Sequence, residues 1–342
     1  MRTHVENKQW HELARHRGRQ LMPYFPGFEA RQQPVSQNRN KMKRIILCLM
    51  VAVLAMASAT QAQQPLTPTQ YSNVRGVLNP AATLIHQGGE IATLGRRQWV
   101  GIEGAPTVLW GSGYAGFSSL GATAGINIRH ESLAVEKLTE ASAFFAKAVR
   151  ISEHEYVGLS LNAGITHLNG KFSQLDPADP AFRDDVIETD ALVGFGVVLY
   201  RPDRYYVGLS MPRLMLGNLG VDEDNRYNFR NQYHVVAGAL FGLGGSGTFH
   251  LRPALLATYA ENLRPQFEVS AMVFASRMIG VGLNARNHGE LAGMLQFNIA
   301  GLGLSYAYQF NPKHEAMNQR IENTTHEIGL SYRFNSPVRS IL

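Results

Sequence analysis

Apolar side chains alternate with small or polar ones in many segments of this chain after residue 90. One segment, 157–166, reads Val-Gly-Leu-Ser-Leu-Asn-Ala-Gly-Ile-Thr, and the pattern returns in 120–129, 266–273, 279–286, 302–310 and 327–334. Successive side chains of a β-strand point to opposite faces, so each segment has one apolar face and one small or polar face when it is extended. The chain is therefore predicted to be all-β.

Two folds use strands of this kind. A soluble sandwich turns the apolar faces inward, whereas a transmembrane barrel turns them toward lipid and keeps the polar faces in its lumen. The segments run for about ten residues, which matches a tilted crossing of a bilayer. Glycine is frequent in mid-segment, and aromatic residues such as Tyr200, Tyr206, Tyr259 and Tyr332 gather near segment ends, as an interfacial girdle requires. These features favour the barrel, and the sandwich is the alternative.

The barrel is expected to be antiparallel and to have about 14 strands, an even number as bacterial outer-membrane barrels have. The strands are predicted at 90–101, 105–116, 120–130, 139–150, 154–166, 189–200, 204–216, 230–242, 247–259, 265–276, 278–287, 289–299, 301–311 and 324–334. Every second connection between them is short, and the others include the long stretches 168–188, 217–229 and 312–323. Short periplasmic turns and longer outer loops are typical of such barrels.

The N-terminal region carries an export signal. Residues 42–62 combine Met42-Lys43-Arg44, an apolar run and a small, polar end, which is the pattern of a signal peptide cleaved after Ala62. Residues 1–41 fit no fold and are interpreted as a mis-annotated or disordered extension, with a real cytoplasmic extension as the alternative. The remaining domains are then a periplasmic N-terminal segment at 63–89, an outer-membrane barrel at 90–335 and a C-terminal tail at 336–342.

Charge and cysteine content exclude several classes of protein. Residues 1–62 hold 10 of the 32 Lys and Arg but 3 of the 26 Asp and Glu, so the basic character belongs to the leader region. The mature chain has no basic stripe for phosphates, and no nucleic-acid partner is expected. The one cysteine, Cys48, lies in the leader, which excludes a disulfide framework and a cysteine-based metal site.

No catalytic, cofactor-binding or metal-binding residues are predicted. The G-x-G-x-x-G matches at 111–116 and 242–247 are followed by strand-like residues, whereas a dinucleotide site needs a helix there. No H-E-x-x-H zinc motif occurs. A serine–histidine hydrolase, for instance with Ser160 and His154, has no local signature, so the chain is not expected to be an enzyme. The acidic stretch 176–190 is interpreted as a solvated loop, with calcium binding as the alternative.

Three motifs open the mature chain. They are Gln70-Tyr71, Leu78-Asn79-Pro80-Ala81 and the block R-Q-W-V-G-I-E-G-A-P at 97–106, which contains Arg97, Gln98, Trp99, Gly101, Gly104, Ala105 and Pro106. Proline cannot donate a backbone hydrogen bond, so Pro80 and Pro106 are expected at turns that bound the first strand. Trp99 suits a membrane interface or a contact with a lumen plug. Arg97 is not expected to face lipid at mid-depth.

These motifs resemble those of the PorP/SprF family, outer-membrane proteins of the type IX secretion and gliding-motility machinery of Bacteroidetes. The resemblance covers about residues 65–335 and implies an outer-membrane location. It also implies a role in the export or surface attachment of partner proteins through protein–protein contacts. The implied partners are outer-membrane lipid, periplasmic or outer-membrane secretion-system proteins and an exported adhesin.

Two questions stay open at the level of sequence. The motif residues either seat the barrel or form a partner-docking surface. The alternative function is a channel or transporter for small or hydrophobic molecules, with Arg129, Arg286 and Arg333 facing its lumen. No cofactor is expected under either function.

Overall fold

The computed structural model describes residues 67–86, 88–175, 184–216, 231–244, 247–261, 263–287, 289–310, 324–335 and 341–342. The predicted signal peptide at 42–62 and the extension at 1–41 lie outside these residues, as do most of the predicted long loops. In the described part, no helix is long and apolar enough to cross a membrane.

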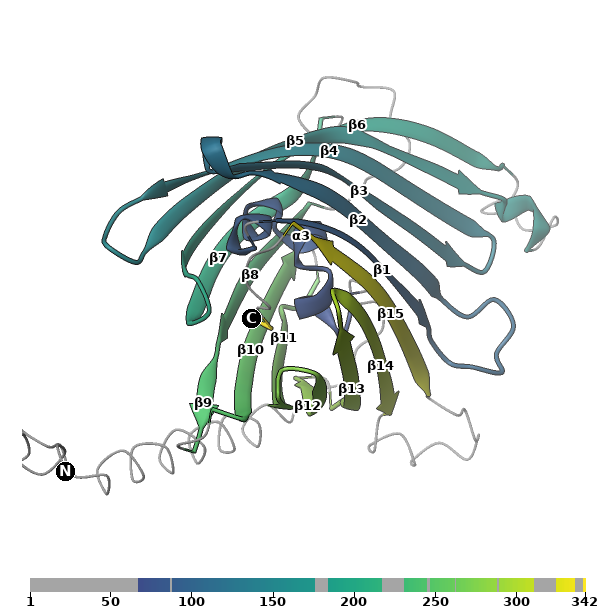
Figure 1. Cartoon of the computed structure of the whole chain (residues 1–342). Coiled ribbons are helices and arrows are strands. Elements are labelled where there is room, and N and C mark those ends of the chain that lie inside the picture. The colour runs from purple at the N-terminus through teal and green to yellow at the C-terminus, as the bar shows by residue number, and fades with distance from the viewer. Residues whose placement is uncertain are drawn as a thin grey trace, which may run out of the picture. The chain divides into compact units, whose positions relative to one another are not determined.

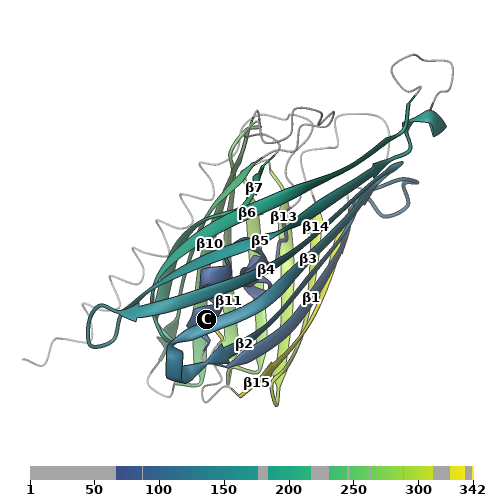
Figure 2. The same cartoon turned by 90° about the horizontal axis from the view of Figure 1, so that it is seen from above.

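The strands form one closed antiparallel sheet (Figures 1 and 2). They are β1 Gly89–Arg97, β2 Thr107–Phe117, β3 Ala122–Leu133, β4 Glu136–Arg150, β5 Tyr156–Gly170, β6 Val186–Arg201, β7 Tyr205–Met215, β8 Gln232–Ala239, β9 Phe241–Leu243, β10 Phe249–Ala260, β11 Gln266–Ala275, β12 Ile279–Arg286, β13 Leu291–Ile299, β14 Leu302–Phe310 and β15 Thr325–Phe334. Neighbouring strands in sequence pair with each other, except that β8 and β9 both pair with β10. Because β1 pairs with β15 and β10 pairs with β11, the sheet has no free edge.

The barrel has 14 crossing strands, as predicted. The short strand β9 follows β8 after a break at Leu240, and both pair with β10, so they form one interrupted crossing. A second irregularity lies in β7, where the register shifts between Ser210 and Arg213 at Pro212. Proline has no backbone N–H for the ladder, which explains the shift.

The two ends of the barrel differ. Turns at 118–121, 151–155, 202–204, 276–278 and 300–301 lie at the end where β1 begins and β15 ends, which we call the short-turn rim. The connections 98–106, 171–185, 216–231 and 311–324 belong to the other end, the long-loop rim. The connections 134–135, 261–265 and 287–290 at that rim are short.

Side-chain exposure confirms that the apolar faces point outward. Leu161 and Leu283 are 72% and 71% exposed, while their strand neighbours Asn162 and Asn284 are buried inside. The exposed apolar side chains recur on every second residue of the strands, which is the pattern of a lipid-facing surface. One detail of the predicted aromatic girdle is wrong, because Tyr200 and Tyr206 point inward and are 5% and 3% exposed.

The lumen is filled by the residues that precede β1. This segment, Thr67–His86, is called the plug and contains the short helices η1 Tyr71–Asn73, α3 Arg75–Leu78 and η2 Pro80–Ile85. All its residues except Asn73 and Val77 are buried, and Figure 1 shows it within the ring of strands. The N-terminal segment was expected to lie in the periplasm. The structure does not confirm that placement: the polar and apolar groups of the plug find their partners on the inner wall.

Candidate functional site in the barrel lumen

The first residues of the plug are held near the long-loop rim by Glu327 of β15. Its carboxylate accepts hydrogen bonds from the backbone N–H groups of Thr69 and Gln70 at 2.8 and 3.1 Å. Arg96 of β1, which stands opposite Glu327 in the sheet register, donates to the same carboxylate at 2.7 Å. Arg96 and Glu327 are each 1% exposed. One carboxylate therefore joins the plug to both strands of the β1–β15 pair.

A second carboxylate–guanidinium pair holds Thr67. Glu268 of β11 accepts a hydrogen bond from the Thr67 hydroxyl at 2.5 Å, and Arg286 of β12 donates to the Thr67 carbonyl at 2.8 Å. Glu268 and Arg286 are register partners and form an ion pair at 3.0 Å. We call Thr67–Gln70 with Arg96, Glu268, Arg286 and Glu327 the clamp.

The other end of the plug lies against β5, β6 and β7, closer to the short-turn rim. The Asn79 side-chain oxygen accepts from the Ala81 N–H and caps η2, while its amide nitrogen donates to the carbonyl of Val197 at 3.0 Å. The Leu78 carbonyl accepts a hydrogen bond of 2.6 Å from the Ser210 hydroxyl. Pro80 at the first position of η2 supplies a fixed backbone angle where no N–H donor is needed.

Glycines on the inner wall leave room for this part of the plug. A Cβ atom added at Gly158 of β5 would lie 2.5 Å from Leu84, and one at Gly208 of β7 would lie 2.6 Å from the Asn79 amide. Both glycines belong to copies of the sequence Tyr-Val-Gly-Leu-Ser, at 156–160 and 206–210. The repeated motif thus places a small residue at two points where the wall meets the plug, so a larger side chain would collide with it.

Apolar packing completes this contact. Leu78, Ala81, Leu84 and Ile85 are each at most 5% exposed and belong to one buried cluster. Wall residues of that cluster include Ala146, Val198, Tyr206 and Val236. We call Asn79–Ile85 with its wall contacts the seat. It differs from the clamp in that burial of apolar surface, rather than charge, dominates it.

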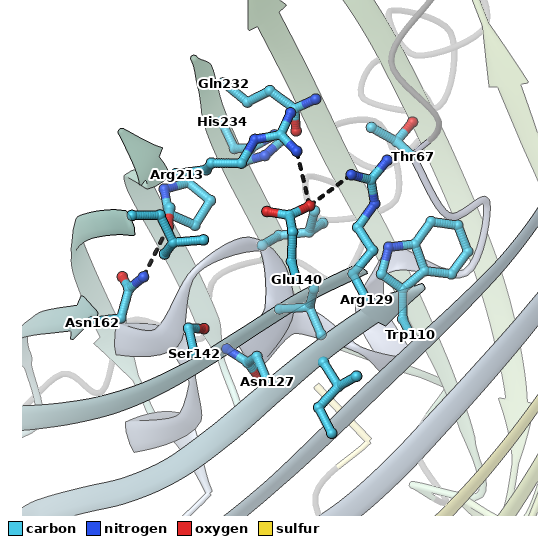
Figure 3. A pocket seen from close by; sticks show the side chains of 15 residues that line it. Thr67, Trp110, Asn127, Arg129, Glu140, Ser142, Asn162, Arg213, Gln232 and His234 are labelled. Carbon is cyan, nitrogen blue, oxygen red and sulfur yellow. Dashed lines mark hydrogen bonds and ion pairs between the residues drawn. The ribbon is translucent and has the colours of Figure 1, made fainter. Parts of the chain in front are cut away.

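A small cavity separates the plug from the opposite part of the wall (Figure 3). Its volume is about 60 Å³, and plug residues Thr67, Val77 and Leu78 form one side. On the other side the Glu140 carboxylate accepts hydrogen bonds of 2.8 Å from both Arg129 and Arg213. The described residues contain no group of three or more His, Asp or Glu side chains arranged to hold a metal ion.

The structure separates the predicted motif residues into two places. Gln70, Tyr71, Leu78, Asn79, Pro80 and Ala81 lie in the plug. Arg97, Gln98, Trp99, Gly101, Gly104, Ala105 and Pro106 lie at the end of β1 and in the β1–β2 loop at the long-loop rim. Pro80 therefore does not mark a turn next to the first strand, whereas Pro106 immediately precedes β2, as expected.

The β1–β2 loop presents apolar groups outward. Trp99, Val100 and Ile102 are 41%, 36% and 37% exposed, and Trp99 adopts a positive φ of 46°. Gly101 and Gly104 have φ values of 102° and 72°, which only glycine adopts without strain. The Gly104 carbonyl accepts from the Ala134 N–H at 2.8 Å, which ties the loop to the β3–β4 turn. Trp99 is thus exposed at this rim.

The residues of the clamp could be predicted only in part from the sequence. Arg286 was expected in the lumen, as were Arg129 and Arg333, and the structure places all three on the inner face. Arg96, Glu268 and Glu327 were missed. The available signal was a charged residue on the polar face of a strand, which costs too much on the lipid side. Alternation identifies the face of such a residue but not its partner across the barrel.

Comparison with known proteins identifies the family. The family model of the type IX secretion system membrane protein PorP/SprF matches residues 60–332. The chain belongs to the PorP/SprF family. It is accordingly an outer-membrane β-barrel protein of the type IX secretion system. No curated protein matches the sequence significantly.

Several solved outer-membrane barrels are similar at low identity. A TodX ΔS2S3 mutant monoaromatic hydrocarbon channel shares 9% identity, covers 83% of this chain and 98% of its own, and has a TM-score of 0.43. The CymD monoaromatic hydrocarbon channel shares 13%, with coverages of 76% and 92% and a TM-score of 0.43. BamA from Haemophilus ducreyi lacking POTRA domains 1–3 shares 11%, with coverages of 72% and 70% and a TM-score of 0.39. These scores are too low to transfer any function.

Proposed function

We propose that this PorP/SprF barrel supports the export or surface attachment of partner proteins through contacts made by its rims. The observation that carries this proposal is the filled lumen. The plug is buried and fixed at both ends, and the cavity between the plug and the wall has a volume of about 60 Å³. Sites for drug-sized ligands usually occupy about 300–1,000 Å³. We therefore infer that the barrel acts through its outer surfaces rather than through its lumen.

The β1–β2 loop is the first candidate contact. With short turns on the periplasmic side, the long-loop rim faces the cell exterior. The loop places Trp99, Val100 and Ile102 there as neighbouring exposed apolar groups held by a hydrogen-bonded backbone. Aromatic and apolar anchors on a rigid loop are what a protein partner would use. The motif residues of this loop thus favour docking, whereas those of the plug favour seating of the barrel.

Site-specific photo-cross-linking in cells tests this proposal. A benzophenone amino acid replaces Ile102 in the loop, Ile151 in a turn of the short-turn rim, or Leu161 on the lipid face as control. We expect cross-links to secretion-system or exported proteins from the rim positions and none from Leu161. Deletion of the gene should abolish export or attachment of the cross-linked cargo. Normal export and attachment in the deletion strain would refute the proposal.

Conductance measurements in planar bilayers test the alternative function of a channel or transporter. A plugged barrel should show no steady conductance in planar bilayers, and only plug-deleted protein should conduct. Open, stable channels from the intact protein would favour transport over a scaffold role.

A further inference from the structure

Two buried arginines in the lumen have no carboxylate partner among the described residues. Arg75 of α3 and Arg252 of β10 are 6% and 5% exposed. Within the described part of the chain, neither forms an ion pair, and both terminal nitrogens of Arg75 lack any hydrogen bond. Other arginines deep in the lumen are matched to a carboxylate, as in Arg96–Glu327, Arg286–Glu268 and Arg333–Glu90.

The carboxylate that acts on Arg75, Glu90, is already paired with Arg333, and the closest groups around the two guanidinium groups are aromatic rings. The Arg75 guanidinium lies 5.7 Å from the ring centre of Tyr206, and that of Arg252 lies 4.8 Å from the ring centre of Phe274. Ring faces attract cations, but they carry no net charge. Among the described residues, the acceptors to which Arg252 donates are neutral, and they include the Ile341 carbonyl at 2.7 Å and the Gln296 side chain at 3.2 Å. The two guanidinium groups also repel each other.

A third group in this region lacks a partner. His86, at the end of the plug, is 4% exposed, and its Nε2 atom makes no hydrogen bond within the described residues. It lies in the field of Arg75, Arg252 and Arg333. A buried charge without a counter-charge is strongly unfavourable, and such groups in proteins pair or bind an ion. The short-turn half of the lumen therefore has an excess of positive charge that calls for an anion.

We propose that Arg75 and Arg252 bind a small anion, either a carboxylate or an inorganic anion, inside the lumen. The bound anion links α3 of the plug to β10 of the wall. It is thus a third attachment of the plug, separate from the clamp and from the seat. Neither the export role nor the rim contacts depend on this site.

The anion can come from two sources. A cavity of about 10 Å³ lies beside Arg252 and is bordered by residues 69, 70, 72 and 73 of the plug, though not by Arg75, and this is room for one water-sized ion. The second source is the tail: Ile341 and Leu342 are 3% and 1% exposed and pack in the cluster that contains Tyr206 and Phe274. If Leu342 ends the protein, its carboxylate lies one residue from the carbonyl that Arg252 binds.

Equilibrium unfolding of the purified barrel in detergent tests the site. Sodium fluoride or sodium chloride is titrated against sodium gluconate at constant ionic strength, since gluconate is too large for the cavity. A ligand that binds only the folded state raises the urea midpoint with the logarithm of its concentration. We expect this rise for one or more of the small anions and its loss in Arg75→Met and Arg252→Met. The exposed Arg264→Met should keep it.

A variant that lacks residues 341–342 distinguishes the sources. If solution supplies the anion, the intact protein responds to it. If the tail carboxylate fills the site, the intact protein is insensitive and the shortened protein becomes sensitive. Both results support the site.

Insensitivity of the intact and shortened proteins alike would overturn the proposal. A response that survives in Arg75→Met and Arg252→Met would overturn it as well. Should the methionine variants fail to fold, Arg75→Lys and Arg252→Lys retain the charge but lose the forked geometry. They should then weaken the anion response by about tenfold, the value of one charged hydrogen bond.

Discussion

The two ends of the plug are fastened by opposite means. The clamp holds Thr67–Gln70 with buried carboxylates and guanidinium groups, whereas the seat holds Asn79–Ile85 with apolar packing and one asparagine cap. Removing charges from water offsets most of what a buried ion pair gains, so its net contribution to stability is small even when its loss is costly. Apolar burial contributes directly. The clamp therefore specifies where the plug lies, and the seat supplies most of its binding free energy.

Removal of one clamp charge should have the largest effect. Glu327→Gln leaves Arg96 buried without a counter-charge, and we expect the free energy of unfolding to fall by about 3–5 kcal/mol. Urea unfolding of the purified barrel, followed by the electrophoretic shift between folded and unfolded forms, measures it. A loss below about 1 kcal/mol, as for a surface pair, would mean that Glu327 is hydrated.

A truncation in the seat should come next. Leu84→Ala removes buried methyl groups beside Gly158, with an expected loss of about 2–5 kcal/mol. Because no charge is involved, the loss should be the same in low and high salt. The lipid-facing Leu161→Ala is the control and should leave plug binding unchanged. A strong salt dependence for Leu84→Ala would contradict the division between seat and clamp.

Neutralising the clamp pair should cost less than breaking it. In Arg96→Met/Glu327→Leu both charges leave together, so the remaining cost is the hydrogen bonds of the Thr69 and Gln70 amides, about 1–2 kcal/mol in total. Residues 63–342 contain no cysteine, so a single Thr69→Cys substitution reports on this end of the plug. We expect faster thiol labelling at position 69 when this substitution is combined with the double variant. Equal losses for the double and single variants would show that the charges themselves stabilise the barrel.

The asparagine cap should have the smallest effect. Asn79→Ala loses the bond to the Ala81 N–H and the donor to Val197, and we expect a loss of about 1 kcal/mol. Asn79→Asp keeps the capping oxygen but buries a carboxylate against the Val197 carbonyl, so it should be less stable than the alanine variant. If the aspartate variant were the more stable of the two, the cap would outweigh the wall contact.

Strand positions were predictable from sequence because lipid and lumen impose opposite polarity on alternate residues. Predicted and observed bounds of β7, 204–216 and Tyr205–Met215, differ by one residue at each end. The break at Leu240 was not foreseen, since Phe241–Leu243 continues the same apolar character. The alternation of apolar and polar residues predicts which face of the sheet a residue occupies. It does not predict short interruptions of the hydrogen bonds between strands.

The plug was not predictable in the same way. Residues 67–86 have no period of a long helix or of a strand, and their short helices end within one or two turns. Their burial depends on partners far away in sequence, such as Glu327 for Thr69 and Ser210 for Leu78. The repeated Tyr-Val-Gly-Leu-Ser sequence was visible, but only the structure shows that its glycines face the plug. Similarity to a family marked the plug residues without revealing their place.

The position of Glu327 has a consequence for how the protein is made. This carboxylate sits at the junction where the first and last strands meet, and it is shared between that junction and the segment that precedes the first strand. If β1 paired with β15 before the plug entered the lumen, the Glu327 carboxylate would be buried without the plug N–H groups that donate to it. During assembly, the strands should therefore fold around a plug that is already in place. Pairing of β1 with β15 would then depend on the presence of the plug. Bulky fusions placed just ahead of Thr67 would interfere with that last step.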